Sequence, residues 1–109
     1  MAIENELILT TDTSLLIVPG DKTYAVTTIV VCNYASVTTS TYDTTFTLHV
    51  IKSGESKGNT NMILNAIPVK AQETFTFSLE KIILSAGDSI VLTAADNDRL
   101  SATISYLEV

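Results

Sequence analysis

Apolar and polar residues alternate along much of this chain, most clearly near the C-terminus. Between residues 73 and 79, two phenylalanines and a leucine alternate with threonine and serine. A period of two sends successive side chains to opposite faces of a β-sheet. Alternation returns at residues 89–94 and 100–109, after turn sequences at residues 85–88 and 96–98. The pattern predicts three antiparallel strands joined by tight turns, with Gly87 at a positive φ and an Asn or Asp of the second turn in the left-handed region.

Further strand-like runs precede this meander, and no segment has a helical period. They cover residues 7–9, 14–18, 24–33, 43–52 and 62–69. The last of these contains Pro68, which has no N–H to donate and therefore favours a sheet edge. We expect an all-β fold, a single antiparallel β-sandwich of about eight strands with jelly-roll or immunoglobulin-like topology. Residues 13–109 would form this domain, and residues 1–12 an N-terminal arm with a loose, acidic start.

The run from Ile29 to Cys32 is apolar at every position. Such a strand is either central and covered on both faces, or meets another subunit with its outer face. The last strand raises a similar question, because Leu107 and Val109 alternate onto the face opposite Leu100. Either a bulge resets the phase there or the tail presents apolar groups to a neighbour. We therefore take Ile29, Val31, Leu107 and Val109 as candidate subunit contacts.

The polar connections contain three notable side chains. Tyr34 and Tyr42 flank a run of small hydroxyl residues, and exposed tyrosine in such a loop is a frequent contact residue. Alternatively, one or both rings fold back onto the edge of the core. His49 alternates with Leu48 and Val50 in its strand, which predicts a solvated or hydrogen-bonded histidine on the wetter face. Residues 53–61 form the longest polar stretch and are expected to be a flexible loop.

Charge narrows the range of partners. The formal net charge is −6, and the six basic residues are scattered along the chain. Nucleic-acid affinity depends largely on basic groups that release counterions from phosphates, so we expect no nucleic-acid partner. The same balance disfavours anionic membranes, and no apolar run reaches the length of a membrane span. The single cysteine, Cys32, lies in an apolar strand and is expected to act as a small hydrophobic residue.

The residue inventory disfavours catalysis and metal binding. The chain has one histidine, one cysteine and no tryptophan, whereas a nucleophile needs both a base and an orienting group. A structural zinc site needs about four ligands. The acidic sequence at residues 96–98 lacks the glycine and closing glutamate of a calcium loop, so it is interpreted as a turn. We expect no enzyme activity, no catalytic or metal-ligating residues and no cofactor.

Several motifs in order resemble the small β-sandwich virion structural proteins of tailed phages, especially those of marine cyanobacteria. They are IVVCN at 29–33, TLHV at 47–50 leading into a Lys-Ser-Gly loop, EKIIL at 80–84, AGDSI at 86–90 and ISYLE at 104–108. The resemblance spans residues 24–109. It implies a structural part of a virion, such as a capsid decoration, neck, tail or baseplate protein, and it implies no catalytic residues.

The resemblance therefore implies a non-enzymatic virion protein assembled in the host bacterial cytoplasm. The expectation that we favour is a capsid decoration (cement) protein, a homotrimer that binds the major capsid protein or other virion proteins on the outer shell. The arm would reach over the shell with Ile3, Leu7 and Leu9 as candidate partner contacts. The alternatives are a neck, tail or baseplate component, or a module that binds host glycans through Tyr34 and Tyr42.

Overall fold

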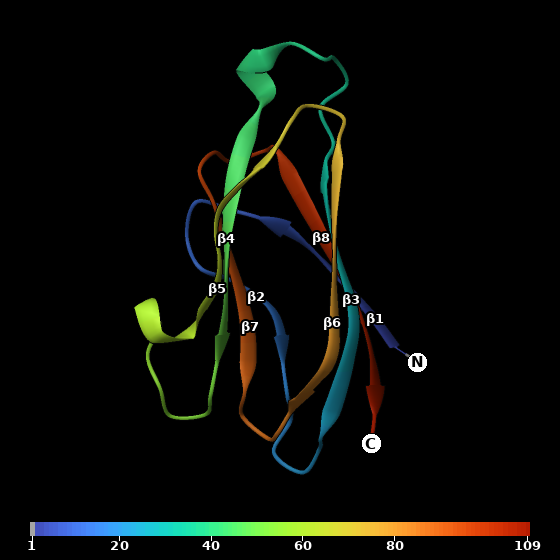
Figure 1. Cartoon of the computed structure of the whole chain (residues 1–109), viewed down its shortest axis with the longest axis vertical. Coiled ribbons are helices and arrows are strands. Elements are labelled where there is room, and N and C mark those ends of the chain that lie inside the picture. Colours follow the sequence, from blue (N-terminus) through green and yellow to red (C-terminus); the bar gives the residue numbers. More distant parts are fainter. Residues whose placement is uncertain (1) are drawn as a thin grey trace.

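The computed structural model describes residues 2–109, without the side chains of residues 79–81. Within this range the chain forms eight strands and two short 3-10 helices (Figure 1). The strands are β1 (Ala2–Ile8), β2 (Thr13–Ile17), β3 (Tyr24–Asn33), β4 (Thr44–Ile51), β5 (Met62–Val69), β6 (Thr74–Leu84), β7 (Ser89–Ala94) and β8 (Leu100–Glu108), and the 3-10 helices are η1 (Ser40–Tyr42) and η2 (Asn59–Asn61).

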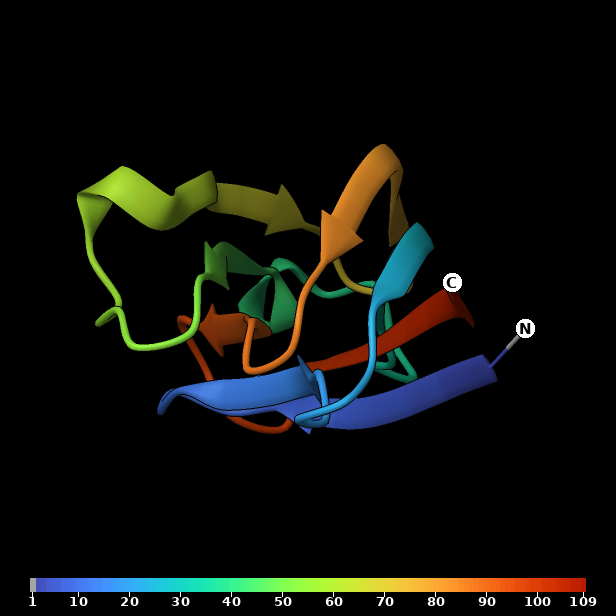
Figure 2. The same ribbon diagram turned by 90° about the horizontal axis from the view of Figure 1, so that it is seen from below.

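The strands form two packed four-stranded sheets. Sheet A has the order β1-β8-β3-β6 and sheet B the order β2-β7-β4-β5, and every described pairing is antiparallel. Seen from below, the sheets form two rows, with β1 and β2 at one side and β5 and β6 at the other (Figure 2). The expected antiparallel β-sandwich is confirmed, and the strand order is that of a jelly roll. As predicted, β5 is an edge strand.

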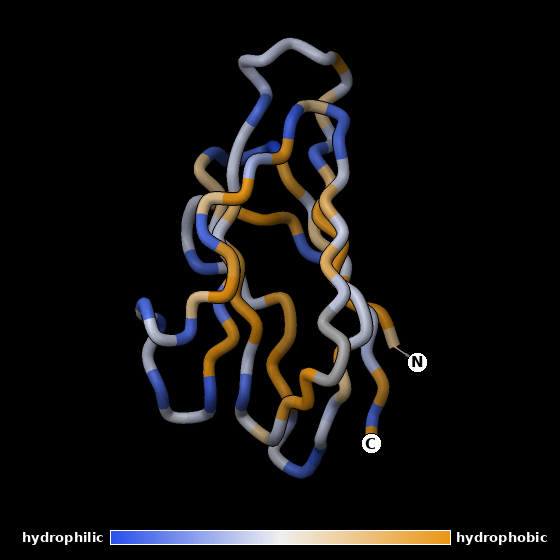
Figure 3. Tube along the Cα trace, viewed as in Figure 1, coloured by the Kyte–Doolittle hydropathy of each residue, from blue (hydrophilic) through white to orange (hydrophobic). Residues whose placement is uncertain are grey.

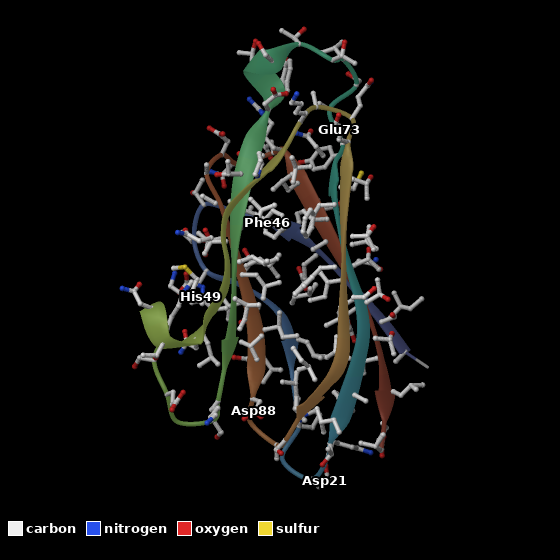
Figure 4. All side chains as sticks on the ribbon, in the orientation of Figure 1. Asp21, Phe46, His49, Glu73 and Asp88 are labelled. Atoms are coloured by element: carbon white, nitrogen blue, oxygen red, sulfur yellow. The ribbon has the colours of Figure 1, made fainter. Side chains whose placement is uncertain are left out.

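The core fills the space between the sheets. Phe46 and Leu48 enter it from sheet B, while Ile29, Val31 and Ile104 enter it from sheet A, and all are at most 1% exposed. Phe46 points between the sheets in Figure 4, and its ring meets that of Phe75 edge-on at a centroid distance of 5.5 Å. Interdigitation of apolar side chains from two inward faces is what holds a sandwich together.

The N-terminal segment differs from the expected loose arm. β1 pairs with β8 over its whole length, from Ala2 opposite Tyr106 to Ile8 opposite Leu100. The prediction of an arm separate from the sandwich is therefore wrong for Ala2–Ile8. An edge strand borders solvent on one side, so it needs few apolar residues, and only Ile8 of β1 is buried. The polar composition that suggested an arm also suits an edge strand.

The C-terminal strand keeps its alternation to the end. Tyr106 is buried and Leu107 is exposed, so no bulge in β8 resets the phase. The register shift lies in β3 instead, between Val26 and Thr28. There the Thr27 hydroxyl donates a hydrogen bond to the backbone carbonyl of Ser105 at 3.0 Å. Leu107 therefore points away from the core, which excludes the first of the two alternatives expected for this strand, a bulge that resets the phase.

The connections carry most of the charge. Asp21 and Asp88 lie at one end of the sandwich and Glu73 at the other (Figure 4), and hydrophilic segments concentrate in the connections (Figure 3). The Asp88 carboxylate accepts backbone N–H groups of Ser53 and Ser85, each at 2.9 Å. The two turn predictions are confirmed, because Gly87 has φ 85° and Asp98 has φ 59°.

Candidate interaction surfaces

The outer face of sheet A is the broadest candidate surface, and we call it the uncharged face. Cross-strand register places its residues in rows, such as Asn5, Thr103, Val30 and Thr76. Among the outward-facing side chains that the structure describes, none is charged. They are Ile3, Asn5, Leu7, Ala25, Thr28, Val30, Cys32, Thr74, Thr76, Ser78, Ile83, Ser101, Thr103, Ser105 and Leu107.

Hydroxyl residues lie on β8, β3 and β6 of the uncharged face, with Val30 and Cys32 among them on β3. The most exposed large apolar residues of this face lie on the edge strands β1 and β6. Ile3 and Leu7 on β1 are 62% and 56% exposed, and Ile83 on β6 is 60% exposed. The Asn5 amide donates to the Thr103 hydroxyl at 2.7 Å, so part of the polar surface is already paired within the sheet. A surface with few charges and paired polar groups loses little hydration free energy when it is covered.

The candidate subunit contacts separate into two classes. Ile29 and Val31 are completely buried between the sheets, so the prediction that they contact another subunit is wrong. The apolar run arises because β3 is a central strand whose outer residues, Val30 and Cys32, are themselves half-buried by neighbours. Leu107 and Val109 are exposed and remain candidate contacts. Leu107 belongs to the uncharged face, and Val109 follows it at the strand end.

The candidate partner contacts do not form one site. Ile3 and Leu7 lie on the uncharged face, and Leu9 is exposed in the connection after β1. Tyr34 and Tyr42 belong to the loop end beyond β3, where both are exposed. Ile3, Leu7 and Leu107 thus share the uncharged face, whereas the two tyrosines lie on a separate surface.

Asn33 organises the loop end that carries these tyrosines. Its side-chain amide is buried and donates to the carbonyls of Tyr42 and Val69 at 2.8 and 3.1 Å. Its carbonyl accepts the Ala35 N–H at 3.1 Å. The guanidinium of Arg99 lies 4.6 Å from the centre of the Tyr42 ring, a cation–π distance. Sequence reasoning missed Asn33, although a polar residue at an inward register position of an apolar strand was the available signal.

His49 faces outward from sheet B, yet it is only 4% exposed. Of the two expected environments, solvated or hydrogen-bonded, the solvated one is therefore wrong. Its Nδ1 atom has no hydrogen-bond partner among the described residues. Burial lowers the pKa of His49 below its ordinary value, the charge of Lys57 lowers it further, and Asp12 opposes both. Lys57 forms an ion pair with Asp12, which connects the loop after β4 to the segment between β1 and β2. An alternating pattern does not reveal such a covering loop.

Potential metal ligands are dispersed over the part of the chain that the structure describes. There, no group of three or more His, Cys, Asp or Glu side chains is placed to hold a metal ion. Within the same residues, none of the helices is long and apolar enough to span a membrane.

Comparison with protein-family models gives no match, and comparison with curated proteins or with solved structures gives none either.

Proposed function

We propose that this protein is a non-enzymatic structural protein of a tailed-phage virion, a capsid decoration protein that binds the outer shell. The observation that carries the proposal is the uncharged face of sheet A, on a protein whose net charge is −6. Jelly rolls are frequent in viral capsids and also in lectins, so the fold is compatible with this function without deciding it. The ordered motifs of the sequence favour the virion.

The uncharged face suits a lasting contact with a protein surface. Its exposed apolar residues, Ile3, Leu7, Ile83 and Leu107, would lose water when covered, which is the main favourable term in association. Its hydroxyls can pair with backbone or side-chain groups of a partner without the desolvation cost of a charge. A protein that binds only the assembled shell stabilises that shell by mass action.

The scaffold presents this face rigidly. β3 and β8 are central in sheet A and are hydrogen-bonded on both sides. The connections at the two ends are anchored by side-chain hydrogen bonds from Asn33 and to Asp88. Little conformational entropy would be lost on binding, because the backbone is already ordered.

The proposed assembly is a closed homotrimer on the shell, since small particle proteins that repeat around symmetry axes associate by closed symmetry. Sedimentation equilibrium of the purified protein tests this part. A mass three times that of the chain is expected. If the protein stayed monomeric at all concentrations, the proposed homotrimer would be refuted. Shell binding would then be tested separately.

Copy number per particle tests the function itself. The virion is purified and this chain is quantified against the major capsid protein by mass spectrometry with isotope-labelled peptides. A ratio near one, or a simple fraction of it, is expected for a decoration protein. A ratio small enough for a single ring would place the chain in the neck, tail or baseplate, and absence from the particle would refute the virion function.

A further inference from the structure

The edge strands β1 and β2 lie together at one side of the sandwich (Figure 2). Residues of both strands line a cleft there. Its volume is about 290 Å³, which suits a small ligand or a single long side chain. Leu16, Ile17 and Pro19 line it from sheet B and the chain that follows β2. Glu4, Tyr24 and Tyr106 line it from sheet A. Ser14 and Leu15 also line it from β2, so one wall is mainly aliphatic with a single serine, and the other combines two aromatic rings with a carboxylate.

The rings of the two tyrosines pack against each other in a tilted arrangement. Their ring centres are 4.5 Å apart and the ring planes are tilted by 38°. Tyr106 is buried and Tyr24 is half-buried, so both rings are held by the sheet. The faces of aromatic rings carry partial negative charge and attract cations.

Glu4 is the only charged group among the described residues that line the cleft. The Tyr106 hydroxyl donates to a Glu4 carboxylate oxygen at 3.4 Å. Burial raises the pKa of Tyr106 and the charge of Glu4 raises it further, so the phenol stays neutral at physiological pH. Lys22, two residues before Tyr24, forms an ion pair with Glu108 at 3.2 Å. Within the described part of the chain, Glu4 forms no ion pair of its own.

We propose that this cleft binds an alkylammonium group, with its charge at Glu4 and the rings of Tyr24 and Tyr106, and its alkyl part along Leu16 and Pro19. An anion would be repelled by Glu4, and a purely apolar ligand would cover the carboxylate without pairing it. An alkylammonium ion can pair its charge with the carboxylate and the aromatic rings on one wall, and can lay its alkyl part against the aliphatic residues of the other. The group would come from a lysine side chain of a neighbouring protein or from a small quaternary ammonium compound. This inference does not depend on the proposed virion function.

Titration of the isotope-labelled protein, followed by amide NMR, tests the site. The probes are n-butylammonium, which reproduces a lysine side chain, tetramethylammonium, and neutral 1-butanol. We expect saturable shifts at Glu4, Tyr24 and Tyr106 with an ammonium probe, and affinity about tenfold lower for 1-butanol, the scale of a cation–π and carboxylate contact. Tighter binding of n-butylammonium would indicate lysine as the source, and tighter binding of tetramethylammonium a quaternary compound.

Two matched variants control for charge and fold. Glu4→Gln is expected to lower ammonium affinity about tenfold while keeping a native amide spectrum. Glu73→Gln makes the same charge change in a loop at the end of the sandwich (Figure 4) and is expected to leave affinity unchanged. The proposal is overturned if no ammonium probe gives saturable shifts, if 1-butanol binds equally well, or if Glu4→Gln binds like the unmodified protein.

Discussion

The side-chain amide of Asn33 donates a hydrogen bond to the backbone carbonyl of Tyr42 at 2.8 Å. The bond ties the end of β3 to the 3-10 helix η1, which precedes β4. A second bond from the same amide, to the Val69 carbonyl, adds the end of β5. One buried side chain thus joins β3 of sheet A to β5 of sheet B and also holds η1.

Replacing Asn33 by alanine is expected to lower the free energy of unfolding by about 2–3 kcal/mol, because the buried carbonyl of Val69 and the part-buried carbonyl of Tyr42 both lose their donor. Urea denaturation monitored by circular dichroism measures the change. Asn59→Ala, at an exposed position, serves as the control and should stay within about 0.5 kcal/mol. A loss below about 0.5 kcal/mol for Asn33→Ala would show that water replaces the amide at little cost.

Gly87→Ala is expected to destabilise the protein by about 1–3 kcal/mol, because a non-glycine residue at φ 85° is strained. The added Cβ would also lie 2.7 Å from the Ser53 Cβ atom. Thermal unfolding compares this variant with Gly20→Ala, where an added Cβ meets nothing within 4 Å and φ is not in the left-handed region. Equal melting temperatures for the two variants would contradict the assigned turn geometry.

The stability of this protein is expected to fall as the pH drops below the ordinary histidine pKa. Because burial and Lys57 lower the pKa of His49 in the folded state, the unfolded chain binds the proton first, near the ordinary histidine pKa of 6.5. The free energy of unfolding therefore decreases as pH falls from 6.5 toward the folded-state pKa. His49→Gln should lose this dependence, which urea titrations at about pH 7.5 and about pH 5.5 would reveal. If the free energy of unfolding fell by the same amount between these pH values in both proteins, His49 would not be the group responsible.

A charge placed on the uncharged face should weaken shell binding. Thr76→Glu is expected to weaken binding to purified shells about tenfold or more, because the new carboxylate must be desolvated in the contact. Thr38→Glu makes the same change in the exposed loop before η1 and should bind normally. Co-sedimentation with shells compares the two variants, and unchanged melting temperatures confirm their folds. Equal binding of the two variants would show that the shell contact does not lie on the uncharged face of sheet A.

Local patterns in the sequence were enough to identify most elements of this protein. Alternation identified the strands of the C-terminal half because side chains of an extended backbone point to opposite faces in turn. Local backbone preference identified the turns at Gly87 and Asp98, since each depends on only a few adjacent residues. Pro68 indicated an edge strand through its missing N–H, and β5 is an edge strand.

Which strands are neighbours, and what covers their faces, emerged only from the tertiary structure. Ala2 pairs with Tyr106, and Asn5 bonds to Thr103, across almost the whole length of the chain. Alternation assigns residues to a shared face without saying whether that face is inside, so Ile29 was misplaced and the cover over His49 was missed. The order of the strands depends on packing contacts between residues that are distant in the sequence, throughout both sheets. A local pattern of residues does not contain this information.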